Sequence, residues 1–462
     1  MPKRSPFFAS PALCRTETVF CCPSFSSASK GWKHKKAGAW QSNFAVQGGE
    51  ILKRYLNFLT ALSAVLGLMF ATVLGTADYF TANSYTVTQG DSLSWNNGAL
   101  SIVKTGTPEV SASTADCPES CRAELMLYHT IPVKTVQLNI VGDSDSFVVA
   151  CGMPFGIKMF TNGVVIVGLS DIKTQAGAVN PASDAGLQTG DIILAVNGKT
   201  TDTNTDVEKA IESCGGSSIK FSINRDGQKF SAAVSPVRSE SDGQYKVGLW
   251  VRDSTAGIGT MTFYDPAGKC FAGLGHGICD SDTGRLMPLL SGDVVPVTIS
   301  GITKGLKGTP GELRGYFTDE MADGTLFENV ASGVYGTLNK TVEGKPVKVA
   351  MKQEVKTGPA QIYTTISGNT PKLYSIEIEK IDYRDGVQSK NLILHITDQQ
   401  LLSQTGGIVQ GMSGSPIIQD GKLVGAVTHV FVNDPTRGYG IFAESMLAES
   451  KNVSKQEQKL AS

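Results

Sequence analysis

The hydrophobic pattern begins with one long apolar run. Residues 55–74 carry no charge and are largely apolar, and Lys53 and Arg54 precede them. About 20 such residues can span a bilayer, and flanking basic residues favour a cytoplasmic N-terminus. The pattern therefore predicts a membrane-spanning helix over 51–76. The next segment, 77–122, is rich in polar residues and has little apolar periodicity, so we expect a polar linker there.

The apolar run is either a cleaved signal peptide or an uncleaved signal anchor, and the absence of a clean cleavage box favours the anchor. In both cases the chain after Thr76 lies outside the cytoplasm. Residues 1–50 show no period and precede the run, whereas a targeting segment normally begins close to the N-terminus. We expect these residues to be either a gene-model extension or a disordered cytoplasmic tail.

Beyond the linker, short apolar runs alternate with turns rich in Gly, Pro, Asp and Asn. Alternation over 123–150 predicts two or three strands. The region 245–450 repeats such runs, which favours a β-barrel or sandwich. Its expected strands are 247–251, 259–264, 292–302, 347–355, 361–366, 373–381, 391–396 and 425–432. Helical periodicity returns only from about Ser445, and residues 451–462 are expected to be a tail.

A second signal lies within 151–236. Residues 181–198 read PASDAGLQTGDIILAVNG, and 206–214 read DVEKAIESC. These motifs resemble a PDZ domain, with a strand at 192–196, a turn of positive φ at Asn197–Gly198 and a groove-lining helix. PDZ domains bind peptides by adding a strand to a sheet edge. The resemblance assigns the loop that receives a peptide's terminal carboxylate to Phe155, Gly156 and Ile157.

The strongest chemical signal is the sequence GMSGSP at 411–416. A serine between glycines on a tight turn exposes its hydroxyl, and the N–H groups of Gly411 and Ser413 can form an oxyanion hole. The motif resembles the nucleophile turn of chymotrypsin-like serine proteases, which selects Ser413 over Ser415 as the nucleophile. Met412 replaces an aspartate of the better-known turn. We therefore expect this protein to organise its active site differently.

His276, in the sequence GLGHG, is the expected general base because its flanking glycines leave the imidazole accessible. His395 and His429 lie in apolar strand-like runs and are expected to be sheet histidines. The acid that orients the base is less well defined by spacing. The candidates between base and nucleophile are Asp280, Asp282, Asp293, Asp382, Asp385 and Asp398.

Charge and cysteine content narrow the function classes. The 41 Lys and Arg residues balance 42 Asp and Glu residues, and no charged block indicates nucleic-acid binding. The cysteines lack paired spacing with nearby histidines, so we expect no zinc site, and no cofactor is implied. Disulfides and free thiols remain equally open for the six exported cysteines, which are Cys117, Cys121, Cys151, Cys214, Cys270 and Cys279.

Together, the signal anchor, the PDZ motifs, GLGHG, GIVQGMSGSPI and the segment THVFVNDPTRGYGI at 428–441 resemble the sporulation stage-IV-B peptidase (SpoIVB) family. The resemblance covers about residues 51–450. It implies a mainly β protein with a signal anchor, an α+β PDZ domain and a chymotrypsin-like double β-barrel. It also implies that Asp398, fifteen residues before Ser413, completes a triad with His276.

The same resemblance implies a function. The chain would be an exported serine endopeptidase of the forespore, acting in the space between its two membranes. It would cleave its own N-terminal segment and a regulator in a membrane complex, so that an intramembrane protease activates a sigma factor. Two alternatives stay open, an HtrA-like quality-control protease and a non-catalytic PDZ scaffold. The order of PDZ and catalytic domains disfavours the first, and the presence of both His276 and Ser413 disfavours the second.

Overall fold

The computed structural model describes residues 39–460 except for 89–93, 96–98, 105–119, 143–145 and 319–320. By contacts the chain divides into two compact units, residues 1–71 and 72–462.

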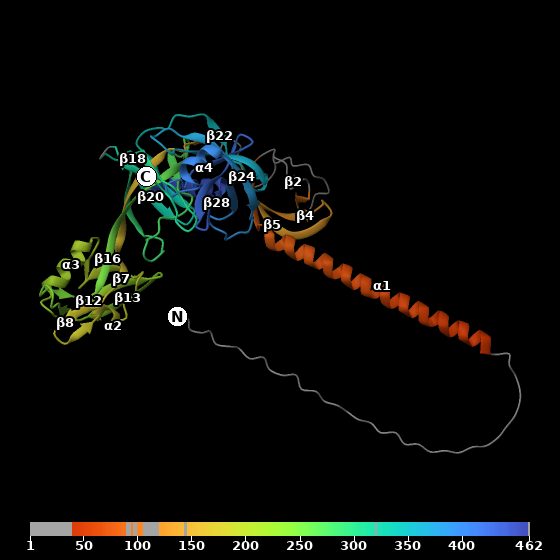
Figure 1. Cartoon of the computed structure of the whole chain (residues 1–462), viewed down its shortest axis with the longest axis horizontal. Helices are drawn as coiled ribbons and strands as arrows, with labels where there is room; N and C mark the ends of the chain where they lie inside the picture. The colour runs from red at the N-terminus through yellow and green to blue at the C-terminus, as the bar shows by residue number, and fades with distance from the viewer. Residues whose placement is uncertain are drawn as a thin grey trace, which may run out of the picture. The chain divides into compact units, whose positions relative to one another are not determined.

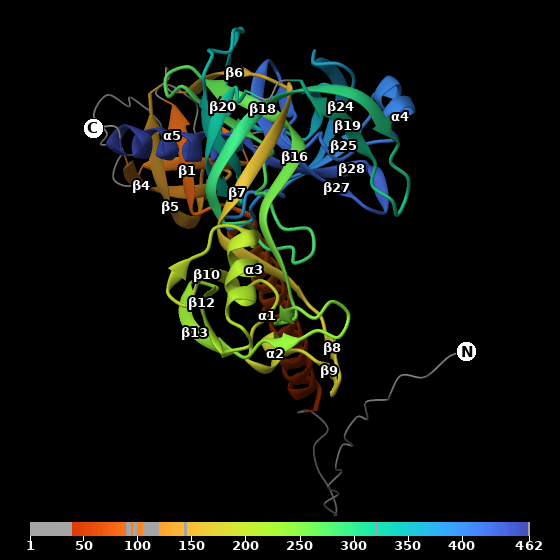
Figure 2. The ribbon, with the colours of Figure 1, turned by 90° about the vertical axis from the view of Figure 1, so that its left-hand side faces the viewer.

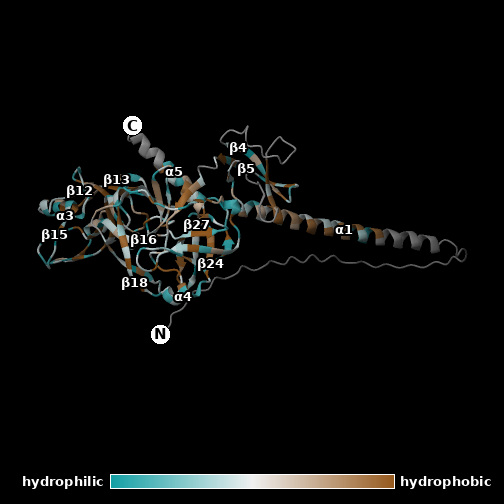
Figure 3. Cartoon of the chain, turned by 90° about the horizontal axis from the view of Figure 1, so that it is seen from above, coloured by the Kyte–Doolittle hydropathy of each residue, from teal (hydrophilic) through white to brown (hydrophobic). Residues whose placement is uncertain are grey.

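Helix α1 (Ala39–Phe80) forms the N-terminal part of the described chain. Its stretch Leu52–Phe80 is long and apolar enough to cross a membrane, as an anchor or as a signal sequence. Hydrophobic positions recur along the helix in Figure 3. The helix is longer at both ends than the predicted span 51–76. The prediction for residues 1–50 falls largely outside the described residues, which begin at 39.

A five-stranded sheet follows α1, with strand order β1-β5-β4-β3-β2. Its strands are β1 (Ser84–Thr88), β2 (Ser94–Trp95), β3 (Leu100–Lys104), β4 (Ser120–Leu127) and β5 (Ile131–Val141). Tyr85, Leu125 and Leu138 are buried in a core of their own. Strands β1, β2 and β3 lie within 77–122 and belong to this sheet, which differs from the predicted linker. The sequence pattern does not reveal these strands, because β1 and β3 span 5 residues each in a polar composition.

The first barrel is a ring of strands in the order β7-β18-β20-β21-β17-β16, and it closes where β7 pairs with β16. The strands are β7 (Pro154–Leu169), β16 (Leu249–Asp265), β17 (Cys270–Gly273), β18 (Leu289–Thr303), β20 (Gly324–Val330) and β21 (Gly333–Leu338). Phe155, Met261 and Phe271 fill its core.

The second barrel is closed in the order β23-β24-β25-β28-β27-β26. The strands are β23 (Gly358–Thr364), β24 (Lys372–Ile381), β25 (Leu392–Ile396), β26 (Pro416–Gln419), β27 (Lys422–Phe431) and β28 (Asp434–Phe442). Helix α5 (Ala443–Leu460) packs on the core through Met446 and Leu447. The mainly β architecture with a double barrel is confirmed. The expected strand over 347–355 is wrong, since only β22 (Pro346–Lys348) and a 3-10 turn (Lys352–Glu354) form there.

The PDZ domain lies between the long strands β7 and β16 in the sequence. Its elements are α2 (Pro181–Asp184), β10 (Ile192–Val196), α3 (Asn204–Ser213), β12 (Ile219–Arg225) and β13 (Gln228–Val234). Asn197 and Gly198 have φ of 50° and 81°, as the turn prediction requires. The PDZ core extends to Val247 and includes the partly buried Leu249 and Val251 of β16. The domain therefore reaches beyond the predicted boundary of 236.

Strands β7 and β16 belong to both domains. The first half of β7 pairs with β18 in the barrel, and Val164 and Val165 pair with β10 in the PDZ domain. Figure 1 shows the PDZ elements grouped together, and Figure 2 shows β7 and β16 running side by side between them and the barrel. The linker between the domains is thus a two-stranded ribbon.

Among the cysteines of the described residues, Cys151, Cys214 and Cys279 are free thiols. Cys117 lies outside the described residues. No group of three or more His, Cys, Asp or Glu side chains that could hold a metal ion is found in the part of the chain that the structure describes.

Candidate active site

Ser413 stands on a tight turn between helix α4 (Gln399–Thr405) and strand β26. Gly411 and Gly414 flank it with φ of 95° and 94°, a region that favours glycine. A Cβ atom on Gly414 would lie 1.9 Å from the carbonyl oxygen of Thr260. The glycines therefore permit both the turn and its close approach to strand β16.

Thr260 of β16 holds this turn at two points. Its N–H donates to the Ser413 carbonyl at 2.9 Å, and its Oγ1 donates to the Gly411 carbonyl at 2.8 Å. Thr262 adds a third bond from Oγ1 to the Gly414 carbonyl at 2.8 Å. The peptide group that carries the Ser413 N–H is thus bracketed by two fixed carbonyls.

We expect Thr260→Val to slow the reaction of Ser413 with a fluorophosphonate by about 10-fold, because one of the bonds that orient an oxyanion donor is lost. Valine is close to threonine in shape, so the melting temperature should fall by only a few degrees. Labelling rate and thermal unfolding measure the two effects. An unchanged labelling rate would show that the turn keeps its geometry without this bond.

The N–H groups of the turn fall into two sets. Those of Met412, Gly414 and Ser415 donate to the backbone carbonyls of Val409, Val427 and Met412. Those of Gly411 and Ser413 donate to no acceptor within the described residues. Two unpaired N–H groups on either side of Met412 are what an oxyanion hole requires.

His276 lies in the loop that follows β17. Its Nδ1 is 2.9 Å from the carbonyl oxygen of Gly277. Because a carbonyl only accepts, Nδ1 carries the proton in this bond and Nε2 keeps a free electron pair. Burial lowers the pKa of His276, against the effect of the Gly277 hydrogen bond. The ring is therefore a neutral base at neutral pH.

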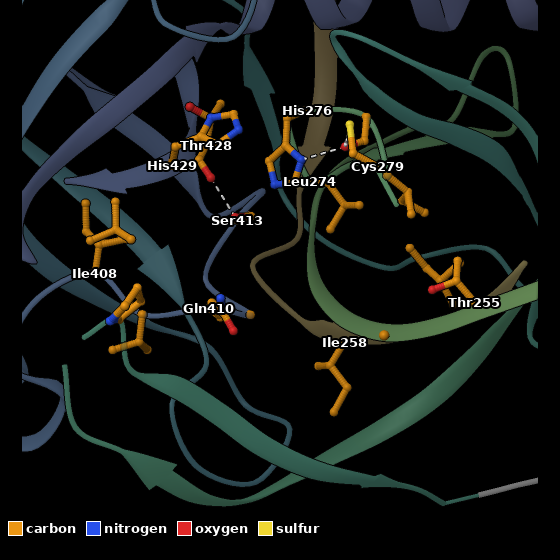
Figure 4. A pocket seen from close by; sticks show the side chains of 18 of the residues that line it. Thr255, Ile258, Leu274, His276, Cys279, Ile408, Gln410, Ser413, Thr428 and His429 are labelled. Carbon is orange, nitrogen blue, oxygen red and sulfur yellow. Dashed lines mark hydrogen bonds between the residues drawn. The ribbon is translucent and has the colours of Figure 1, made fainter. Parts of the chain in front are cut away.

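His276 and Ser413 line the same cavity, which has a volume of about 530 Å³. Its other walls are mostly apolar and include Ile258, Leu274 and Ile408 (Figure 4). The Ser413 hydroxyl donates to the Thr428 carbonyl at 2.6 Å, and the described residues show no bond between this hydroxyl and His276. The sequence-predicted base and nucleophile are thus brought together, with the nucleophile turned toward β27.

Asp398 does not line this cavity. It is the N-cap of α4, where its Oδ1 accepts from the Leu401 N–H at 2.9 Å and its Oδ2 from the Ser375 N–H at 3.3 Å. No Asp or Glu side chain is found among the described residues that line the cavity. The third member of the proposed triad therefore remains a prediction.

Four of the other acidic candidates have partners elsewhere, and Asp293 is an exposed residue of β18. Asp280 and Asp282 pair with Arg252, and Asp382 pairs with Arg384. The Asp385 carboxylate accepts from the Asn83 N–H at 2.6 Å.

The remaining histidines and Ser415 are also placed by the structure. His395 of β25 is 3.5 Å from Glu379, which fits the expected sheet histidine. His429 of β27 differs from that expectation, because it lines the cavity and contacts His276. The signal in the sequence for this placement is that His429 lies sixteen residues after Ser413. Ser415 is fully buried, its hydroxyl donates to the Met412 carbonyl and is bonded to the Thr364 hydroxyl, and it is therefore directed away from the cavity.

The predicted carboxylate-binding loop is wrong. Phe155, Gly156 and Ile157 lie within β7, where they pair with β16 on one side and β18 on the other. All three are buried in the first barrel. The alternation of this segment fits a strand as well as a loop motif, and the local sequence offers no means of telling them apart.

The helix predicted to line the PDZ groove is present as α3. The element beside it is β16, whose Asp253 carboxylate accepts from the Asn204 N–H at 2.8 Å. Residues 249–253 of β16 pair with β7 on one side, and no second strand pairs with them within the described residues. On the same stretch, Arg252 forms ion pairs with Asp280 and Asp282 of the loop after His276.

The fold and this cavity define a two-barrel protease with an attached PDZ domain. Residues 243–447 match the family described as SpoIVB peptidase S55, and residues 177–225 match the PDZ domain family. The resemblance to the SpoIVB peptidases is thus confirmed for the catalytic region, and the chain is a PDZ-containing serine peptidase.

Similar solved structures cover parts of the chain. The Rv3671c protease of M. tuberculosis in its active form is 13% identical, with a TM-score of 0.27 over 43% of this chain and 74% of that one. The HtrA-type protease AlgW with a decapeptide is 11% identical, with a TM-score of 0.26 over 47% of this chain and 56% of that one. The PDZ domain of an SdrC-like protein from Listeria monocytogenes is 20% identical, with a TM-score of 0.17 over 20% of this chain and 87% of that one.

Proposed function

We propose that this protein is an exported, membrane-associated serine endopeptidase in which Ser413 is the nucleophile and His276 the general base. The observation that carries this proposal is the shared cavity, where a hydroxyl on a glycine turn lies near an imidazole with a free Nε2. The N–H groups of Gly411 and Ser413 supply the oxyanion hole. Asp398 is proposed as the acid on the resemblance alone.

The bond from the Ser413 hydroxyl to the Thr428 carbonyl marks a resting arrangement. Catalytic hydrogen bonds are often formed only when substrate is bound. A substrate backbone that adds along β27 would donate an N–H to the Thr428 carbonyl and displace the hydroxyl toward His276. The hydroxyl proton then passes to Nε2 as Oγ attacks the scissile carbonyl.

The proposed biological role rests on the resemblance to the SpoIVB peptidases. We propose that the protease acts outside the forespore inner membrane, cleaves its own N-terminal segment, and cleaves a regulator of an intramembrane protease complex during endospore formation. The apolar stretch of α1 supports a membrane anchor. The peptidase match over 243–447 supports the reaction class.

We further propose that the PDZ domain binds its peptide ligand along residues 249–253 of β16, beside α3. This edge has a free row of backbone groups within the described residues, and PDZ ligands add as a strand to such an edge. The ligand itself would be the substrate complex or the protease's own N-terminal segment.

A fluorophosphonate experiment tests the catalytic assignment. The full chain in detergent should be labelled on Ser413, located by mass spectrometry of the peptide that spans 411–416. Absence of labelling would support a non-catalytic PDZ scaffold. Rapid degradation of unfolded casein by the labelled enzyme would favour quality control over signalling.

The pH dependence of labelling follows from the environment of His276. Burial lowers its pKa, so the neutral base persists to a lower pH than for a free imidazole. We expect the acidic limb of the rate profile to lie below about pH 6.5, the ordinary imidazole value. An acidic limb above that pH would mean that solvent or an anionic group contacts the His276 imidazole in the unreacted enzyme.

A further inference from the structure

His429 enters the cavity because β27 is irregular at this point. Val427 pairs with Gly440 and Val430 pairs with Gly438, so two residues of β27 stand opposite one residue of β28. Such a bulge redirects side chains, and bulges are frequent beside active sites. Here it directs the Thr428 carbonyl toward Ser413 and brings the His429 ring against His276 (Figure 4).

The two imidazoles are in direct contact. Their ring centroids are 4.6 Å apart and the rings are tilted by 35°. The Nδ1 atom of His429 is buried and has no hydrogen-bond partner within the described residues. A buried polar atom without a partner is unfavourable, so a residue with a purely packing role would be better served by an apolar ring.

The proposed reaction creates a partner for this atom. His276 is neutral at rest and becomes positive when it takes the Ser413 proton on Nε2. No carboxylate is found among the described residues that line the cavity. An unpaired acceptor on a ring that contacts His276 stabilises positive charge on His276, and so stabilises the transition state more than the ground state.

We propose that His429 is a positioning residue of the peptidase, whose ring contacts His276 and whose unprotonated Nδ1 stabilises the positive charge that His276 acquires. The inference rests on the proposed roles of His276 and Ser413. The proton moves from Ser413 Oγ to His276 Nε2, the bond from Oγ to the scissile carbon forms, and His429 exchanges no proton. It stays neutral with its own proton on Nε2.

The surroundings keep His429 neutral. Burial, then His276, then Lys390 lower its pKa to about 4. The other titratable group on the described cavity wall is Cys279, whose thiol pKa is raised by burial and by Asp280. The Cys279 thiol is neutral and the Lys390 ammonium group is charged throughout the acidic limb. Within the described residues of the cavity wall, only the imidazoles of His276 and His429 therefore titrate there.

Two substitutions separate an acceptor role from a packing role. His429→Phe keeps an aromatic ring against His276 but removes the acceptor, whereas His429→Asn places an amide oxygen near the position of Nδ1 but removes the ring. The fluorophosphonate labelling rate of the full chain in detergent is measured from pH 4 to 9, with thermal unfolding as a folding control.

We expect His429→Phe to lower the plateau rate by about 10-fold, the effect of losing one interaction with a charged group. Its acidic limb should move to lower pH, because the protonated form of His276 loses stabilisation while its burial is kept. His429→Asn should label within about 3-fold of the wild-type rate, with its limb at or above the wild-type position.

A wild-type rate and an unchanged limb in His429→Phe would overturn the proposal, and so would equal losses in both variants with unmoved limbs. If His429→Phe does not fold, the Asn variant still decides, because a 10-fold loss there contradicts an acceptor role. Failure of the wild-type chain to label Ser413 would instead remove the proposed function itself.

Discussion

Replacing Ser413 with alanine is expected to abolish self-processing and to lower hydrolysis of a small ester by about a million-fold. The hydroxyl is the only side-chain nucleophile on the turn that reaches the cavity, within the described residues. His276→Ala should be about as severe, because nucleophile and base act as a unit. N-terminal sequencing of the purified chain measures self-processing. Hydrolysis of a chromogenic ester by the same chain measures the chemical step independently of peptide binding by the PDZ domain.

Ser415→Ala is the matched control, since it removes a hydroxyl two residues away. The Ser415 hydroxyl is buried and bonds to the Met412 carbonyl at 2.6 Å and to Thr364 at 2.8 Å. We expect this variant to be less stable by about 1–3 kcal/mol and to keep its ester rate within a few-fold. An inactive, folded Ser415→Ala beside an active Ser413→Ala would reassign the nucleophile.

The parts of the fold that the sequence predicts well are those whose chemistry is local. The turn at Asn197–Gly198 requires positive φ, and the strand before it alternates over a full run, so both were placed correctly. The glycines around Ser413 likewise dictate a turn irrespective of the rest of the chain. The double barrel followed from family resemblance and from the repetition of short strands.

What could not be predicted depends on contacts between distant segments. Nothing near Phe155 shows that its strand continues from the barrel into the PDZ domain, because the partners β16 and β18 lie about 100 or more residues away in the sequence. The apolar neighbours of His429 predict a sheet histidine. It is indeed on a strand, but a bulge set by the pairing with β28 directs it toward His276.

Asp398 is the residue on which the family resemblance and the described geometry point in different directions. The resemblance makes it the acid of the triad, whereas its two oxygens accept the N–H groups of Leu401 and Ser375. The resting arrangement already lacks the bond between Ser413 and His276, so an unformed bond to the acid is consistent with it. In this arrangement the Gly277 carbonyl holds the imidazole in the tautomer that the reaction needs.

Asp398→Asn distinguishes the two roles, because asparagine caps a helix about as well as aspartate. We expect the melting temperature to stay within a few degrees of wild type while ester turnover falls by about 10,000-fold, the loss that follows when a triad acid becomes an amide. Asp398→Ala serves as the control that removes the cap as well, and it should lose about 1 kcal/mol of stability in addition. If the asparagine variant keeps near wild-type turnover, Asp398 acts only as the N-cap of α4, the helix that leads into the Ser413 turn. His276 would then be oriented by the Gly277 carbonyl and supported by His429, without a carboxylate.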